Sequence, residues 1–295
     1  MRIGIDWGGT KLEIIALDDD GKTLLRERIA TPQNDYRASV EAVGGLVAKA
    51  ESRTGRTGTV GFGIPGTISP ATGLVKNANS TWLNGKPLEQ DLCAMLGREV
   101  RIQNDANCFA VSEAVDGAGE GARTVAGIII GTGCGCGIAI DGKALTGRGG
   151  IAGEFGHTPL APMMAEEMPG NECWCGRRAC LETYVSGPGF VRTHDAIAGK
   201  TSGLSVAGIL ASDTPDARTA GARYVSQLAR GIAMLVNIVD PDVIVLGGGM
   251  SNISSLYDDL PGAVAPHVFT DRFDTPIVRP RHGDSSGVRG AAWLW

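Results

Sequence analysis

Three cysteines stand within eight positions of the stretch NECWCGRRACLE: Cys173, Cys175 and Cys180. Thiol redox pairs use C-x-x-C, which this spacing does not match, and the charged neighbours indicate an exposed loop rather than a core. Three thiolates and one further ligand would make the tetrahedral site that Zn²⁺ prefers. His157 is the nearest upstream histidine, and spacing alone leaves it either the fourth ligand or a structural residue.

Glycine-rich turns form a second group of candidates. Such turns let backbone N–H groups approach a phosphate closely, although a single one is more often just a tight turn. Asp6, at a strand end beside the first turn, suits a hydrated Mg²⁺. Together they predict a nucleoside triphosphate site; neither a P-loop nor a Rossmann fingerprint is present. The three turns are Gly8-Gly9-Thr10-Lys11, Gly131 to Gly137 (with Thr132, Gly133, Cys134 and Gly135), and Gly247-Gly248-Gly249.

Asn104 and Asp105 stand where a predicted strand passes into a helix. In isolation such a pair is usually a helix N-cap, because the side-chain oxygen accepts an orphan backbone N–H. A carboxylate exposed at the end of a strand is also a candidate general base. The residues alone leave both interpretations open.

The composition favours a compact globular enzyme over a nucleic-acid or membrane protein. Of the 295 residues 43% are hydrophobic, and the net charge is -5 without a basic run. The first twenty residues hold no signal or membrane segment, so a cytoplasmic location is expected. In that reducing compartment seven cysteines are not a disulfide framework, and Cys93 and Cys108 are expected to be core residues.

The elements that position these residues follow a repeated pattern. Strands are predicted at 2–6, 11–18 and 23–30, a helix at 35–53, a strand at 59–66, a helix at 87–97, a strand ending at 104 and a helix from 105. The strand–glycine turn–strand pattern returns at 123–145, followed by a helix near 219–239, a strand at 242–248, a helix from Met250 and a helical C-terminus. We therefore expect two similar α/β domains that face a cleft.

Five strings, DWGGTK, GTGCGCG, GEFGH, CWCGRRACLE and LGGGMS, make the whole chain similar to the ROK sugar kinases. The resemblance implies the two-domain actin-like (ribonuclease H-like) ATPase fold, with the active site in the interdomain cleft. It places an N-terminal domain at 1–117, joined by the C-terminal helix 284–295, and a second domain with the zinc loop at 118–283. KNANSTWLNGKPL and RHGDSSGVRGAAWLW resemble, more narrowly, the bacterial fructokinase (manno-fructokinase) branch.

The resemblance also implies roles for individual residues. Asp105 is the catalytic base, and His157 completes a closed, structural Cys₃His zinc site. ATP and Mg²⁺ are held by Asp6 and the glycine turns, including Gly8, Gly9, Thr10, Lys11, Thr132, Gly133, Cys134, Gly135 and Gly248. The hexose is bound by Gly66, Asn79, Asn104, Asp105, Glu154, His157 and Glu182.

One position departs from the family pattern. The family has glycine before the last cysteine of the zinc loop, and this chain has Ala179. If the backbone there requires a positive φ, alanine is strained by roughly 1 kcal/mol or more.

The predicted activity is ATP-dependent phosphorylation of a hexose at its 6-hydroxyl, with fructose as the first substrate and mannose as a second. A glucokinase or an N-acetylhexosamine kinase is the alternative within the family, and a homodimer is expected. A sugar-sensing regulator is the alternative from another class. It is disfavoured because such regulators carry an N-terminal helix-turn-helix, whereas here the kinase pattern begins at residue 2. A sugar-binding protein without catalysis is disfavoured by Asp105 and the glycine turns.

Overall fold

The computed structural model describes all 295 residues, which form two compact units. The first unit comprises residues 1–127, 137–153 and 280–295, and the second comprises 128–136 and 154–279. Residues 137–153, which the sequence prediction assigned to the second domain, group with the first unit. No helix is long and apolar enough to cross a membrane.

A five-stranded sheet in the order β3-β2-β1-β4-β7 forms the centre of the first unit. β1 pairs antiparallel with β2 and parallel with β4, and β4 pairs parallel with β7. Its strands are β1 (Arg2–Trp7), β2 (Lys11–Leu17), β3 (Thr23–Ala30), β4 (Thr59–Ile64) and β7 (Val100–Asn104), with a small hairpin of β5 (Thr67–Ile68) and β6 (Val75–Lys76).

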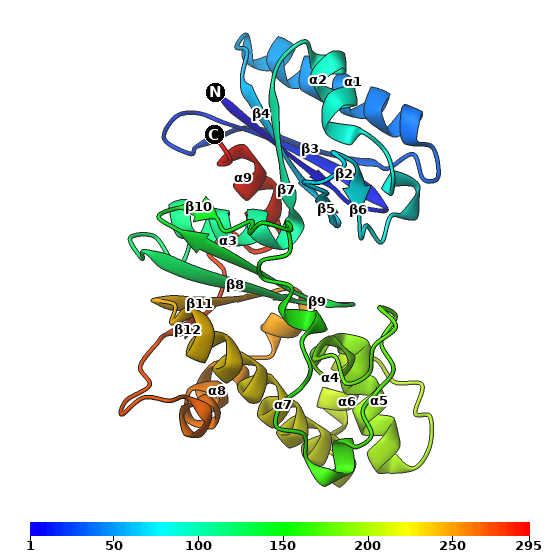
Figure 1. The fold of residues 1–295 in the computed structure, drawn as a ribbon, viewed down its shortest axis with the longest axis vertical. Helices are drawn as coiled ribbons and strands as arrows, with labels where there is room; N and C mark the ends of the chain where they lie inside the picture. The colour runs from blue at the N-terminus through cyan, green and yellow to red at the C-terminus, as the bar shows by residue number, and fades with distance from the viewer. The chain divides into compact units, whose positions relative to one another are not determined.

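Helices cover this sheet and close the first unit. α1 begins after Asp35, whose side chain accepts from the Ala38 N–H, and ends at Gly55 in the left-handed conformation. The C-terminal helix α9, red in Figure 1, packs against β1, β4 and α3, although α9 and β1 stand at opposite ends of the sequence. The helical elements are α1 (Tyr36–Thr54), η1 (Thr81–Leu83), α2 (Leu88–Leu96), α3 (Asp105–Val115), η6 (Gly283–Ser285) and α9 (Ser286–Ala292).

A second sheet repeats the strand order of the first, as β10-β9-β8-β11-β12. In the first sheet the strands joined by the glycine turn, β1 and β2, are neighbours, and β4 lies on the other side of β1. In the second sheet β8 and β9 are neighbours in the same way, and β11 lies on the other side of β8. The predicted repetition of the strand–turn–strand pattern is therefore confirmed. The strands are β8 (Thr124–Ile130), β9 (Cys134–Ile140), β10 (Lys143–Ala144), β11 (Val243–Gly247) and β12 (Ile277–Val278).

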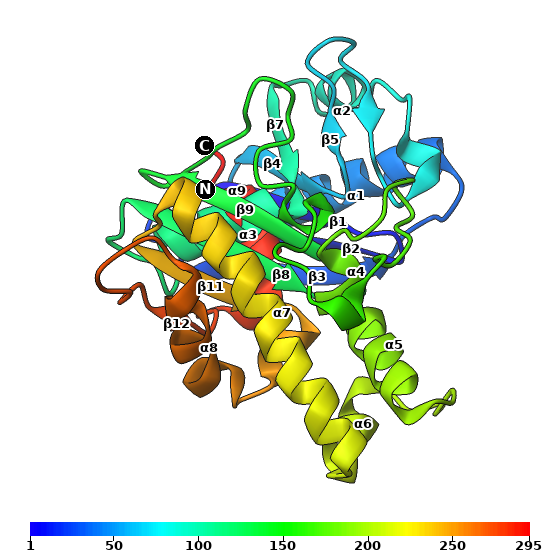
Figure 2. The ribbon, with the colours of Figure 1, turned by 60° about the horizontal axis from the view of Figure 1, so that its bottom comes forward.

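The remaining elements all lie in the second unit and surround a long central helix. Figure 2 shows α7 in yellow between α8 and the α5–α6 pair, and α7 contacts all three. These elements are η2 (Phe155–His157), η3 (Ala165–Glu167), α4 (Glu182–Val185), α5 (Gly187–Ala198), α6 (Val206–Ser212), α7 (Pro215–Val239), η4 (Gly249–Asn252), α8 (Leu256–Val264) and η5 (Ala265–His267).

Two local predictions are wrong. The helix expected from Met250 is only a 3₁₀ turn, because Gly248 has φ +80° and the Ser251 hydroxyl bonds to the Gly248 carbonyl; α8 starts at Leu256. The expected turn at 131–137 is also shorter, since β9 already begins at Cys134 and buries Cys134 and Cys136.

Candidate functional site

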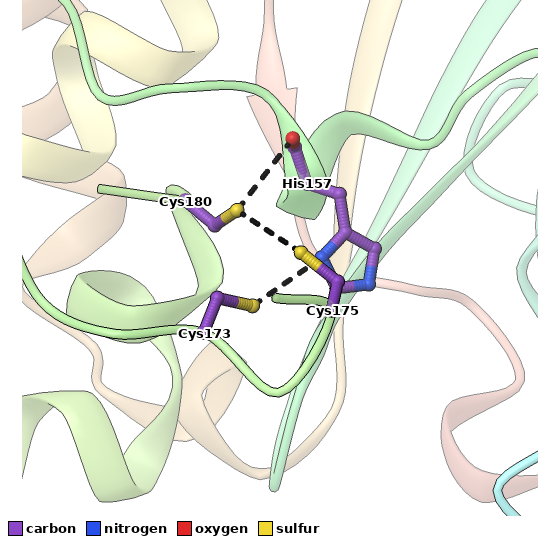
Figure 3. Close-up of side chains that lie close together, drawn as sticks. All are labelled: His157, Cys173, Cys175 and Cys180. Atoms are coloured by element: carbon purple, nitrogen blue, oxygen red, sulfur yellow. Dashed lines mark hydrogen bonds between the residues drawn. The ribbon is translucent and has the colours of Figure 1, made fainter. Parts of the chain in front are cut away.

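The four predicted metal ligands lie together in the second unit. Figure 3 shows His157 from η2 facing three cysteines of the metal loop, which we define as residues 171–182. The four ligand atoms all lie within 4.8 Å of one another. The His157 Nδ1–Cys173 Sγ distance is 3.6 Å, as is the Cys175 Sγ–Cys180 Sγ distance. Zn–S and Zn–N bonds in a tetrahedral site give edges of about 3.8 and about 3.6 Å, so the donor set fits zinc.

Backbone hydrogen bonds define the shape of the metal loop. The Cys173 N–H donates to the Arg177 carbonyl at 2.8 Å. The backbone of Cys180 pairs with that of Pro159, close to His157 in the sequence, in an isolated antiparallel β-bridge. Ala179 has φ +61°, which is the strained backbone expected if alanine replaced glycine there. Its N–H and carbonyl nevertheless bond to Asn171 and Leu160, so the loop geometry is kept.

The thiols of the metal loop differ in acidity. Burial opposes ionisation of Cys175, but hydrogen bonds from Arg177, Cys173 and Cys180 outweigh it and lower the pKa to about 6. Burial, with hydrogen bonds to the other two thiols, raises the Cys180 pKa to about 12. One thiolate is thus formed readily at neutral pH. Arg177 contacts that thiolate, whereas Arg178 pairs with Glu172 at 2.6 Å.

The two predicted sugar carboxylates of this unit have different environments. Glu182 is half-buried, and its carboxylate accepts from the Trp174 indole N–H at 2.7 Å and from the Cys134 backbone N–H at 2.9 Å. Glu154 is exposed just before η2, where its carbonyl accepts from the His157 N–H at 3.3 Å. Glu182 is therefore the more firmly positioned acceptor.

In the first unit, the N-cap interpretation of the Asn104–Asp105 pair is confirmed, and the catalytic role of Asp105 stays a prediction. Asn104 is the N-cap of α3, since its Oδ1 accepts from the Ala106 N–H at 2.9 Å, while its amide donates to the Gly66 carbonyl at 3.1 Å. Asp105 is the first residue of α3 and is exposed. The Asn104 cap fixes the junction of β7 and α3, where the Asp105 carboxylate also accepts from the Ala106 N–H, at 2.8 Å.

Asp6, at the end of β1, is close enough to Asp105 for their charges to interact. Burial first, and then repulsion by Asp105 and Glu13, raise the pKa of Asp6 from 3.8 to about 7. A cation beside this pair would favour the ionised carboxylate.

The first glycine turn connects β1 and β2. The Gly8 N–H is used within the turn, where it donates to the Lys11 carbonyl at 2.9 Å, and Lys11 and Thr10 are exposed. The buried Ser80 of the 76–87 loop packs closely against this turn. A Cβ atom added to Gly9 would lie only 2.9 Å from the Ser80 hydroxyl oxygen. Asn79, predicted to contact sugar, is exposed in the same loop.

The second and third glycine turns meet at one cavity of about 1260 Å³ in the second unit. Gly131 and Thr132 line it from one side and Gly249 from another. Gly133 and Gly248 flank these lining residues, whereas Gly135 lies inside β9 and Cys134 donates its N–H to Glu182. Two of the three predicted turns are thus brought together by the fold.

Sequence reasoning missed the other walls of this cavity. Gly187 and Pro188 begin α5, whose N-cap Ser186 accepts from the Gly189 N–H, and the Gly187 N–H donates to the Gly131 carbonyl at 2.8 Å. The string SGPG was the available signal, since Ser followed by Pro marks a helix N-terminus. Apolar side chains of α5, α6 and η4 complete the lining: Val191, Val206, Leu210 and Met250.

Comparisons with known proteins cover the whole chain. The ROK family profile matches residues 2–295. The N-acetyl-D-glucosamine kinase of Haemophilus influenzae (strain 86-028NP) is 40% identical over 301 residues, covering 100% of this chain and 99% of the relative. The N-acetyl-D-glucosamine kinase of Vibrio cholerae serotype O1 (strain ATCC 39315 / El Tor Inaba N16961) is 40% identical over 300 residues with the same coverage.

Solved structures are similar over nearly the same extent. A ROK hexokinase from Thermus thermophilus superposes with a TM-score of 0.88 at 28% identity, covering 99% of this chain and 97% of the other. A ROK glucokinase from Streptomyces griseus, solved with glucose and AMPPNP, gives a TM-score of 0.77 at 28% identity, covering 99% and 98%. These relatives share the fold, and the N-acetylglucosamine kinases match the alternative expectation better than the fructokinase one.

Proposed function

The chain belongs to the ROK family and is an ATP-dependent sugar kinase of actin-like fold, and from that premise we propose that it phosphorylates the 6-hydroxyl of N-acetylglucosamine. The kinase function is supported chiefly by Asp105, an exposed carboxylate fixed at the end of β7 and the start of α3. The choice of sugar is supported by the relatives at 40% identity over the full chain.

Asp105 acts as the general base of the transfer. A carboxylate of ordinary pKa cannot remove a proton from a free alcohol, so it first orients the sugar hydroxyl in line with the γ-phosphate. It accepts the proton late, as negative charge leaves the attacking oxygen for phosphorus. The Asn104 cap holds α3 in register for this role, and one N–H of its amide stays available to a sugar hydroxyl.

The cavity of the second unit is the proposed nucleotide site. Its apolar lining from α5, α6 and η4 suits a purine ring, and the Gly131–Gly133 turn suits the phosphates. Bound Mg²⁺ would neutralise phosphate charge, and Asp6 is the carboxylate proposed to hold its water shell. Asp6 would then stay ionised at neutral pH despite its raised pKa.

The metal loop is proposed to bind a structural zinc ion. His157, Cys173, Cys175 and Cys180 leave no open coordination position, so the ion would stabilise the loop rather than take part in the reaction. The loop in turn positions Glu182 to accept hydrogen bonds from sugar hydroxyls. Glu154, Gly66 and Asn79 complete the proposed sugar contacts.

Fructose, with mannose as a second sugar, is the other candidate substrate. It is favoured by the 76–87 loop, whose sequence resembles the fructokinase branch. In this loop the Asn84 side chain holds Ala78 through two hydrogen bonds of 2.9 Å, and buried Ser80 lies against the Gly8–Lys11 turn. The loop therefore has a defined conformation, as expected of one that discriminates between sugars.

A coupled assay of ADP release over N-acetylglucosamine, fructose, mannose, glucose and N-acetylmannosamine tests the proposal. The highest kcat/KM is expected for N-acetylglucosamine, and a higher value for fructose would transfer the assignment to the second candidate. No turnover with any sugar would refute the kinase function and favour a sugar-sensing protein. Asp105→Asn is the matched control, because it should remove turnover with every sugar.

A further inference from the structure

The carboxylate of Glu182 connects two parts of the second unit that the proposed function treats separately. One oxygen accepts from the indole N–H of Trp174, which stands between two of the metal-ligating cysteines. The other oxygen accepts from the backbone N–H of Cys134, at the end of the Gly131–Gly133 turn. A single side chain thus joins the metal loop to the glycine turn.

Burial of apolar surface does not explain the position of the Trp174 side chain. It is 73% exposed, an unusual state for the largest apolar side chain. Its ring packs edge-on against His157, with centroids 4.9 Å apart and planes at 79°. The fixed contacts of this residue are therefore a metal ligand on one side and Glu182 on the other.

The glycine turn is equally close to Glu182. A Cβ on Gly133 would lie 2.7 Å from the Glu182 oxygen, so the turn backbone packs directly against the carboxylate. An ionised carboxylate has about four acceptor positions, and the two N–H donors leave others for sugar hydroxyls. The same group can hold the turn, the loop and the sugar at once.

We propose that Trp174 is a positioning residue and that, through it, Glu182 couples occupancy of the metal site to nucleotide affinity at the glycine turn. This inference rests on the proposed nucleotide site. Metal binding fixes Trp174, Trp174 fixes the carboxylate, and the carboxylate fixes the Cys134 N–H and the turn that precedes it. Because coupling between two binding sites is reciprocal, nucleotide should also strengthen metal retention.

Calorimetric titration with Mg-AMPPNP, on full-length protein loaded with Zn²⁺ or stripped by a chelator, tests the coupling. In the wild type, chelation should weaken nucleotide binding about fivefold or more, since fivefold is the lower end of typical coupling between two binding sites. Trp174→Phe keeps the ring beside His157 but removes the N–H donor. Glu182→Gln keeps the shape but cannot accept from both donors. In each variant the effect of chelation on nucleotide Kd should fall below about twofold.

Trp295→Phe is the matched control, since it removes an indole N–H that donates to the Val60 carbonyl in the first unit. It should keep the wild-type response to chelation. The coupling would be overturned if chelation left the wild-type nucleotide Kd unchanged. It would also be overturned if chelation changed the Kd of Trp174→Phe and of Glu182→Gln as much as that of the wild type. Failure of the wild type to bind nucleotide at all would instead overturn the proposed function, and the coupling with it.

Fluorescence supplies a readout independent of affinity. The emission of Trp174, obtained as the difference between wild type and Trp174→Phe, should shift when AMPPNP binds and should not shift in the Glu182→Gln background. Zinc content should stay near one ion per chain in both variants, because neither residue is a ligand. A nucleotide-induced shift of equal size in Glu182→Gln would show that the signal does not pass through the carboxylate.

Discussion

Asp6→Asn is expected to stabilise the ligand-free protein at pH 8 far more than at pH 5. The folded protein holds the Asp6 carboxyl with a pKa of about 7, against an ordinary value of 3.8. Between these two values the folded state binds one proton more than the unfolded state, so the free energy of unfolding falls as the pH rises. The contribution of protonated Asp6 to the free energy of unfolding is therefore fully present below about pH 4, and it is lost as the pH rises through about 7.

The magnitude follows from the size of the shift. A difference of about three pKa units corresponds to ~4 kcal/mol at 1.36 kcal/mol per unit, an upper value because the side chain is only half-buried. Roughly 1.6 kcal/mol of this penalty is already present at pH 5, so the advantage of Asp6→Asn should grow by at most ~3 kcal/mol between pH 5 and pH 8. It should level off above about pH 7.5, where Asp6 is ionised in both states.

Urea denaturation at pH 5, 6, 7 and 8 in the absence of Mg²⁺ and nucleotide measures this difference. Asp105→Asn serves as the companion variant, since repulsion by Asp105 is the second cause of the raised pKa after burial. In that background the pH dependence due to Asp6 should move to lower pH. A difference between Asp6→Asn and wild type that is the same at pH 5 and pH 8 would refute the reasoning.

Further predictions concern the base, the metal loop and a buried ion pair. Asp105→Asn should lower kcat by about 10²- to 10⁴-fold while keeping much of the sugar binding, and a retained kcat would exclude the base role. Ala179→Gly should raise the free energy of unfolding by up to about 1 kcal/mol, because it relieves the positive φ; a lower melting temperature would contradict this. Removal of metal should raise the sugar KM and lower the melting temperature, and unchanged KM and melting temperature would oppose a structural metal. Arg230→Met should cost about 3–5 kcal/mol in urea denaturation, because it strands the buried carboxylate of Glu167; a smaller loss on adding Glu167→Gln would confirm that cause, and additive losses would reject it.

Local sequence signals predicted most regular elements correctly. Apolar runs such as 59–64 and 124–130 form the expected strands, and the Asp35 cap and the Gly55 terminus bound α1 as their types require. These signals work because alternation, capping and left-handed glycines act within a few residues. The same locality explains the failures: the short helices α4 to α6 lack a long periodic stretch, and the helix expected from Met250 depended on the conformation of Gly248.

The sequence by itself identified the candidate residues for chemistry: the three cysteines, Asp105 and the glycine turns, whose residue types and spacings restrict what each can do. It also foresaw the strain at Ala179, a property of one backbone position. Only the tertiary structure decided which of these groups meet. It placed His157 beside the cysteines, the second glycine turn beside the third, and Glu182 between Trp174 and Cys134. The physical reason is that such contacts join residues far apart in the chain, and packing of sheets, helices and loops, rather than local preference, sets those distances.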